Sequence, residues 1–172
     1  QSGFVSGNVV GFMWVPSQNP SLPFPYTRIS TFDSSAGLAH LEDIDIWSPD
    51  YAFVYPSTTV NREGALGGTI MWGGGTTHYP SCSAWMAEAP TSSALVPLDQ
   101  QLAIAGTTGP SNTGGRSGDY LSASTYFPNN LQFVGTCFAY MTSIRGTGRF
   151  LHFGRASSTT DIFADGFESG GV

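Results

Sequence analysis

Residues 52–72 read AFVYPSTTVNREGALGGTIMW. Two runs rich in aromatic and β-branched residues, 52–60 and 65–72, flank the polar stretch Asn61-Arg-Glu-Gly64. Runs of this composition favour β-strands, and a short polar connection that ends in Gly is typical of a hairpin. Gly64 supplies a residue that tolerates a positive φ. The stretch therefore predicts a strand, a tight turn and a second, antiparallel strand.

The same composition recurs along the whole chain. Strand-like runs, bounded by Gly, Pro or Asn, occupy residues 8–15, 26–32, 52–60, 65–72, 78–87, 120–126, 131–141 and 149–155. Pro128-Asn-Asn130 predicts a second hairpin loop, with Asn130 at the positive-φ position. The best helical candidate is Ala36–Leu41, and its apolar spacing is too short to be convincing. We therefore predict an all-β chain.

An internal repeat organises these runs. YPSTT (55–59) leads through a turn to GTIMW (68–72), and YLSAS (120–124) leads through a turn to GTCFAY (135–140). VGFMW (10–14) matches the second half of this unit and lacks the first half. The repeat predicts β-propeller-like blades, about two and a half of them. A β-sandwich is the alternative, since roughly eight strands suffice for one.

A closed propeller takes roughly four to eight blades, because radial closure protects each sheet edge. The chain is therefore expected to be the C-terminal portion of a larger propeller, or a subunit completed by other copies of itself. The predicted organisation is an all-β domain over residues 1–160 and a C-terminal tail over 161–172.

The composition restricts the partners. The 172 residues include six Arg, no Lys and twelve acidic residues, for a net charge of −6. This balance argues against nucleic acid as the main partner. No apolar run approaches the roughly 18 residues of a membrane span, so none is expected. No charged segment precedes an apolar stretch at Gln1, so any signal peptide is expected to have been removed.

Cys82 and Cys137 are the two cysteines. Their spacing fits no zinc motif. Two interpretations stay open, a pair of buried thiols or one disulfide. The even count, the absence of Lys and the low charge fit an exported protein, and therefore favour the disulfide.

Three short motifs resemble those of bacterial sialidase-like secreted β-propeller proteins. AFVYPSTTVNREG (52–64) resembles their blade signature, HYPS (78–81) their "YPS" segment, and GRSGDY (115–120) their "GRWGDY" stretch, with Ser117 in place of Trp. The resemblance implies a secreted propeller. It does not by itself imply sialidase activity, because the Asp-box pattern S-x-D-x-G-x-x-W is absent. DIFADGFE (161–168) is similar to a short tail of exported Gram-negative proteins.

The richest acidic stretch is LEDIDIWSPD (41–50). Strand alternation would place Asp43 and Asp45 on one face, opposite Ile44 and Ile46. Such a pair forms a solvated face, holds a calcium ion, or supplies the two carboxylates of a glycosidase. These three interpretations stay open, with calcium the only cofactor considered, and no catalytic residue is assigned.

Four residues are candidates for ligand binding. Trp47 and Tyr51, beside the acidic stretch, are candidate stacking surfaces for sugar rings. Arg116 and Asp119 flank a Gly in a polar loop, where Arg would bind a carboxylate bidentately or would pair with Asp119.

Three functions remain open at this stage. The first is an exported, non-catalytic propeller-like module that binds glycan or protein at the cell exterior. The second is a self-assembling extracellular surface protein whose sheet edges are completed by neighbouring chains. The third is a sialidase-like glycoside hydrolase fragment.

Overall fold

A computed structural model describes residues 1–17, 19–90, 98–109, 121–142, 145–155 and 162–166 of the chain. The described residues form strands joined by turns and loops, with one short 3-10 turn, so the prediction of an all-β chain is confirmed. The elements are β1 (Ser2–Ser6), β2 (Val9–Trp14), β3 (Thr27–Asp33), η1 (Ser34–Ala36), β4 (Ala39–Ile46), β5 (Ala52–Val60), β6 (Leu66–Gly74), β7 (His78–Ala87), β8 (Asp99–Ile104), β9 (Ser122–Thr125), β10 (Phe133–Thr142), β11 (Arg145–Arg155) and β12 (Ile162–Gly166).

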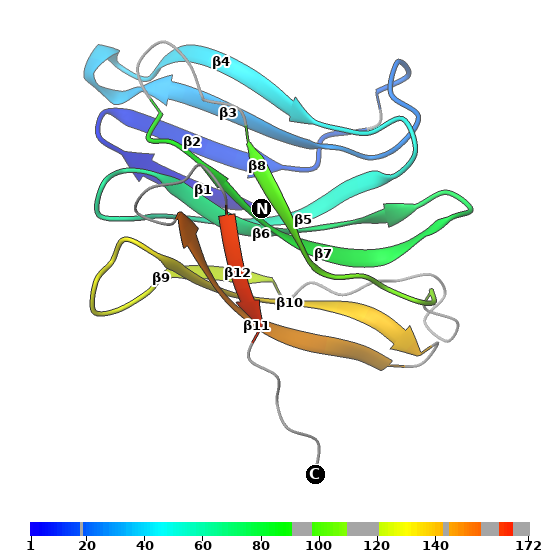
Figure 1. The fold of residues 1–172 in the computed structure, drawn as a ribbon. Coiled ribbons are helices and arrows are strands. Elements are labelled where there is room, and N and C mark those ends of the chain that lie inside the picture. The colour runs from blue at the N-terminus through cyan, green and yellow to red at the C-terminus, as the bar shows by residue number, and fades with distance from the viewer. Residues whose placement is uncertain (18, 91–97, 110–120, 143–144, 156–161, 167–172) are drawn as a thin grey trace.

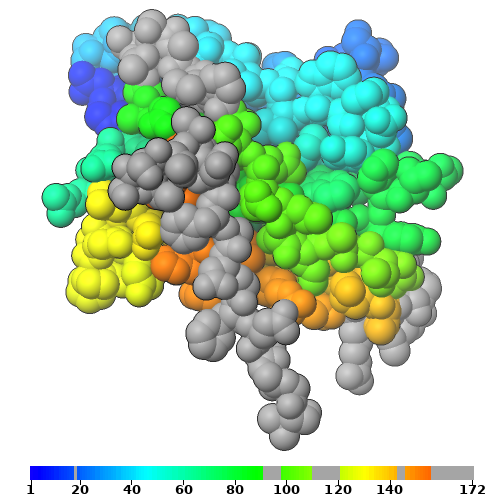
Figure 2. Space-filling view, in the orientation of Figure 1, coloured from blue at the N-terminus to red at the C-terminus, as the bar shows by residue number. Residues whose placement is uncertain are grey.

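The strands form three antiparallel sheets, each built from four consecutive strands. Sheet 1 contains β1–β4, sheet 2 contains β5–β8, and sheet 3 contains β9–β12. They follow one another from top to bottom of Figure 1, and the same succession forms bands from blue through green to orange in Figure 2. The described strands do not close into a barrel.

The two predicted hairpin turns are confirmed. β5 pairs with β6 across residues 61–65, and β9 pairs with β10 across residues 126–132. Gly64 has a φ of 86° and Asn130 a φ of 53°, as the turn chemistry predicts. The Asn61 carboxamide oxygen accepts hydrogen bonds from the amides of Glu63 and Ala65, and its Nδ2 donates to the carbonyl of Leu131 at 2.9 Å. One side chain therefore holds its own turn and ties it to the next sheet.

Two hydrophobic cores lie between successive sheets. The core between sheets 1 and 2 contains Phe4, Met13, Ile29, Leu66, Ile70 and Trp85. The core between sheets 2 and 3 contains Cys82, Ala84, Met86, Phe133, Leu151 and Phe153. Sheet 2 is covered on both faces, and for this reason β7 is buried without interruption from Ser81 to Ala87. Within the described ranges, sheets 1 and 3 are each covered by another sheet on one face only.

The disulfide between Cys82 and Cys137 is confirmed, with a Cα–Cα distance of 6.2 Å. Cys82 belongs to β7 and Cys137 to β10, so the bond joins sheet 2 to sheet 3. Both residues are buried within the core between these sheets. The disulfide therefore fixes covalently a packing that hydrophobic contacts already make.

Four strands lie outside the runs predicted from sequence: β1, β4, β8 and β12. The first repeat unit therefore has an opening strand, β1, and the expectation that it lacks one is wrong. β12 lies inside the segment expected to be a tail, and it pairs with β11. Ala36–Leu41, the weak helix candidate, holds the end of η1 and the start of β4. All four missed strands are sheet edges, which pair on one side only and need less of the apolar pattern.

Candidate functional site

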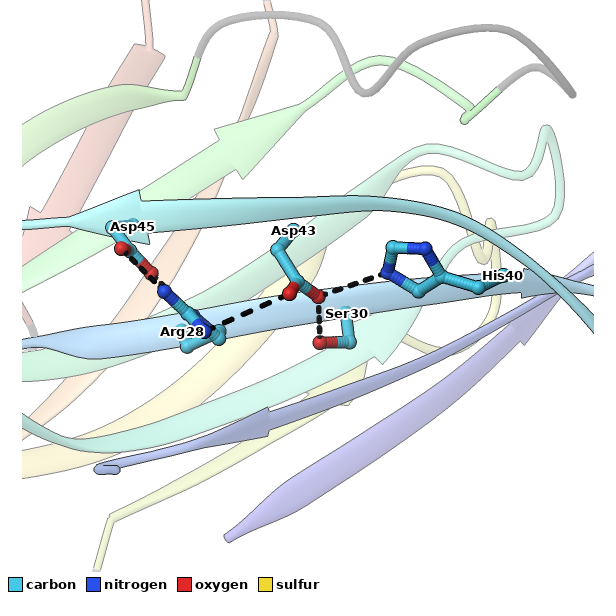
Figure 3. A network of polar contacts seen from close by, with 5 residues as sticks. All are labelled: Arg28, Ser30, His40, Asp43 and Asp45. Carbon is cyan, nitrogen blue, oxygen red and sulfur yellow. Dashed lines mark hydrogen bonds and ion pairs between the residues drawn. The ribbon is translucent and has the colours of Figure 1, made fainter. Parts of the chain in front are cut away.

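Polar side chains alternate along two neighbouring strands of sheet 1. In the register of β3 and β4, Arg28 lies opposite Asp45 and Ser30 lies opposite Asp43. Directly opposed residues of an antiparallel pair share one face, so these side chains meet. Arg28 holds Asp45 through two hydrogen bonds, Nε to Oδ1 at 2.7 Å and Nη2 to Oδ2 at 2.8 Å. Figure 3 shows this bidentate pair at one end of a polar row.

Asp43 stands in the middle of the row (Figure 3). It accepts a hydrogen bond from the Ser30 hydroxyl, and its Oδ1 lies 3.1 Å from His40 Nε2. Arg28 Nη1 is 3.6 Å from Asp43 Oδ2. The Ser30 hydrogen bond, the His40 hydrogen bond and the Arg28 charge lower the pKa of Asp43, while hydrogen bonding to Asp45 raises the pKa of Arg28. Both contact patterns favour the charged forms.

This geometry favours a solvated ion-pair row over the other two interpretations of Asp43 and Asp45. Calcium takes about six to eight oxygen ligands, and here both carboxylates face a guanidinium. Within the part of the chain that the structure describes, no group of three or more His, Cys, Asp or Glu side chains is placed to hold a metal ion. A general acid near neutral pH needs a raised pKa, and that of Asp43 is lowered.

Aromatic rings gather where β4 connects to β5 and β6 connects to β7. Tyr51 lies 4.7 Å from His78 and 5.0 Å from Trp72, measured between ring centroids. Trp72 donates from Nε1 to the Ser83 hydroxyl at 2.9 Å, which fixes its ring. Trp47, immediately after β4, is 50% exposed. We call Trp47, Tyr51, Trp72 and His78 the aromatic end.

The two predicted aromatic ligands therefore differ in their surroundings. Tyr51 is half-buried within a ring cluster, and Trp47, four residues earlier in the chain, is an exposed ring. Local spacing does not predict the contacts of Tyr51 with Trp72 and His78, because these rings reach it through the fold of sheet 2. Trp72, whose repeat position favours a core residue, also packs against the core between sheets 1 and 2. Arg116 and Asp119, the other two predicted ligand residues, lie outside the described residues.

The sequence pattern also missed Arg28, Ser30 and His40. A usable signal exists, since Arg28 and Ser30 alternate on one strand as Asp43 and Asp45 do on the next. Their pairing requires the register of β3 against β4, which local spacing does not supply. Arg155 is a comparable case, because it pairs with Glu88 at 2.9 Å and with Asp99 at 2.5 Å from distant parts of the chain.

A row of apolar side chains continues the polar row on the same face of sheet 1. Phe32 lies 5.5 Å from His40 and 6.1 Å from Phe12 between ring centroids. Phe12 is 51% exposed and Val5 63% exposed. Together with Trp14, Phe12 and Phe32 line a shallow apolar groove of about 360 Å³. We call this face of sheet 1, with both its polar row and its apolar groove, the sheet-1 outer face.

A cleft of about 690 Å³ lies at the opposite end of the sheets from the aromatic end. Its walls are the β1–β2 turn, the β5–β6 turn, the start of η1 and Ala89–Pro90. Asp33 lines it, and hydrogen bonds from the Ser35 hydroxyl and amide lower the pKa of that carboxyl. These bonds form an ordinary helix N-cap, so the cleft suggests no chemistry of its own.

Comparison with protein-family models, with curated proteins and with solved structures finds no match. The described residues include no helix long and apolar enough to cross a membrane. The function must therefore be argued from the geometry of the chain itself.

Proposed function

We propose that the chain is an exported, non-catalytic, propeller-like module that binds a glycan through its aromatic end. The observation that carries the proposal is the 50% exposed ring of Trp47 in the β4–β5 connection, which also contains Tyr51 with its ring contacts to Trp72 and His78. Aromatic rings present flat apolar surfaces with polar edges, and sugar rings present apolar C–H faces that stack on such surfaces. The protein-binding alternative at the cell exterior uses the same exposed rings.

The arrangement of the sheets supports a propeller-like module. The first strands of the three sheets, β1, β5 and β9, contact one another in succession. Polar bonds join the strands and the turns beside them: the amide of Thr58 in β5 donates to Ser2 Oγ in β1 at 3.0 Å, and Ser6 Oγ donates to the carbonyl of Gly64 in the β5–β6 turn at 2.7 Å. The amide of Arg62 donates to the carbonyl of Asn130 at 2.8 Å in the next step. Four-stranded sheets with adjacent first strands are the construction of a propeller.

The disulfide supports export. Disulfides persist in oxidising compartments and are rare in the cytosol. The Cys82–Cys137 bond is buried within a core and joins two sheets, so it has a structural role. A secreted or cell-surface location, as in the bacterial sialidase-like propellers that the motifs resemble, agrees with such a bond.

A glycan array tests the proposal. We expect binding to a restricted set of glycans, and a loss of about tenfold in affinity for Trp47→Ala, because one aromatic contact contributes roughly 1 to 1.5 kcal/mol. Phe127→Ala is the matched control, since Phe127 is an 81% exposed ring in the β9–β10 turn, at the other end of the sheets. Binding that survives Trp47→Ala, or that is lost equally in both variants, contradicts the proposal.

A further inference from the structure

The register of the three sheets makes their positions directly comparable. Phe12, Ile70 and Cys137 occupy the same place in the repeated segments VGFMW, GTIMW and GTCFAY, at the centre of the second strand of each sheet. Ile70 faces sheet 1 and is 2% exposed, and Cys137 faces sheet 2 and is 3% exposed. Phe12 faces the same way, has no described sheet above it and is 51% exposed. The sheet-1 outer face is therefore equivalent to two faces that are covered.

The next residue along each second strand faces the opposite side of its sheet. There too, the equivalent residues are covered in two sheets and more exposed in the third. Met13 and Met71 are 1% and 2% exposed, because sheets 2 and 3 cover them. Their equivalent in sheet 3 is Phe138, which is only half-buried, and Phe150 beside it is 47% exposed. We call this surface, with Val134, Phe138, Gly148 and Phe150, the sheet-3 outer face. It is equivalent to faces that are covered in sheets 1 and 2.

The two outer faces are complementary in size at the position that can be compared. Across the interface of sheets 2 and 3, Cys137 meets Cys82. In each sheet, one residue of the third strand pairs with the residue that follows the central position of the second strand. This third-strand residue is Cys82 in sheet 2, where it pairs with Met71. Its equivalents are Ile29 in sheet 1, opposite Met13, and Gly148 in sheet 3, opposite Phe138. If sheet 1 of a second copy packed on sheet 3 in the way that sheet 3 packs on sheet 2, Phe12 of that copy would lie opposite Gly148. Gly148 is exposed, and a Cβ built on it would meet only the Cys137 carbonyl oxygen, at the ordinary contact distance of 3.9 Å. This position of the sheet-3 outer face therefore has no side chain to exclude the Phe12 ring.

We propose that two copies of this chain close into one ring of six sheets, in which the sheet-3 outer face of each copy packs on the sheet-1 outer face of the other. The described residues of one chain form three sheets, and propellers close with about four to eight. Two such sets of three sheets make six, which falls inside this range. Head-to-tail contacts of this kind form a ring when the rotation between units closes. The inference rests on the propeller-like arrangement and is independent of the glycan site.

The mass of the native particle tests the ring. Light scattering after size exclusion should give twice the 18.2 kDa of one chain at micromolar concentration. A charge at either of the two positions set opposite each other should abolish the dimer, so Phe12→Asp and Gly148→Glu should each give monomers with an unchanged β-sheet circular dichroism spectrum. Leu102→Asp is the matched control, because Leu102 is 51% exposed on β8, away from both outer faces, and this variant should remain dimeric.

Mixing the two variants distinguishes the head-to-tail ring from other dimers. Each variant keeps one intact outer face, so an equimolar mixture of Phe12→Asp and Gly148→Glu should recover a dimer joined by one interface. A dimer formed between two sheet-1 outer faces would withstand Gly148→Glu and would not be recovered by mixing. A monomeric wild-type chain, or an open polymer, overturns the proposal. None of these outcomes depends on whether a glycan binds.

Discussion

Ile70 and Phe12 hold the same place in two sheets, yet one is 2% exposed and the other 51%. Both are large apolar residues at the centre of a second strand. Their strands pair in the same antiparallel way, so the difference lies in what covers them: sheet 1 lies over Ile70, and no described sheet lies over Phe12. The comparison teaches that one strand position is buried where a second sheet packs on it and is exposed where no described sheet does.

Removal of the disulfide between sheets 2 and 3 should cause the largest loss in the free energy of unfolding. Replacing both cysteines, Cys82→Ala with Cys137→Ala, removes a bond that closes a loop of 54 intervening residues. The loop-closure model predicts a loss of about 4 kcal/mol in the free energy of unfolding. Urea unfolding at a fixed protein concentration measures it, with reduced wild-type protein as the control. An unchanged midpoint would mean that packing alone holds sheet 3 on sheet 2.

The substitutions Ile70→Ala and Phe12→Ala test most directly whether the covered and the exposed position differ in their contribution to stability. Ile70→Ala should lower the free energy of unfolding by roughly 3 kcal/mol, because it leaves a cavity between two sheets. Phe12→Ala should change it by less than about 0.5 kcal/mol in the dilute monomer, where Phe12 is a surface residue. Urea unfolding at several protein concentrations checks both values.

Concentration supplies the control for this pair. If a second copy covers Phe12, the cost of Phe12→Ala should grow as the protein is concentrated, since association adds to stability by mass action. The cost of Ile70→Ala should stay constant, because sheet 1 of the same chain covers that position. A large cost of Phe12→Ala in dilute solution would show that the two positions are equally buried and would end the comparison.

The sequence predicts the paired inner strands of this fold well. The run 52–72 forms β5, its turn and β6 almost at the predicted bounds, because apolar strands around an Asn-x-x-Gly turn have few alternatives. The edge strands β1 and β8 were missed because their stability comes from pairing and not from composition. DQQLAI (99–104), for example, has no continuous apolar pattern.

The candidate sites are harder to predict than the strands. Asp43 and Asp45 share one face of β4, as strand alternation predicts, yet Arg28, which binds Asp45, precedes it by 17 residues. Trp47 is visible in the sequence as a surface candidate, whereas the contact of Tyr51 with His78 requires the β6–β7 hairpin to fold back. Both sites depend on register, and register is fixed by the packing of whole sheets.

The smallest expected effect concerns the polar row of the sheet-1 outer face. The pKa of Asp43 is lowered in the folded chain, first by the Ser30 hydroxyl, so this carboxylate stabilises the fold above the unfolded value of about 4 and the contribution is lost as the pH falls below it. Asp43→Asn should flatten the acid limb of stability between about pH 4 and 2, by less than about 1 kcal/mol, because the side chain is partly exposed. Ser30→Ala should flatten it similarly. Thermal unfolding across this pH range measures how stability falls with decreasing pH. The same decrease in the wild type and both variants would show that the polar row does not contribute to the stability of this face.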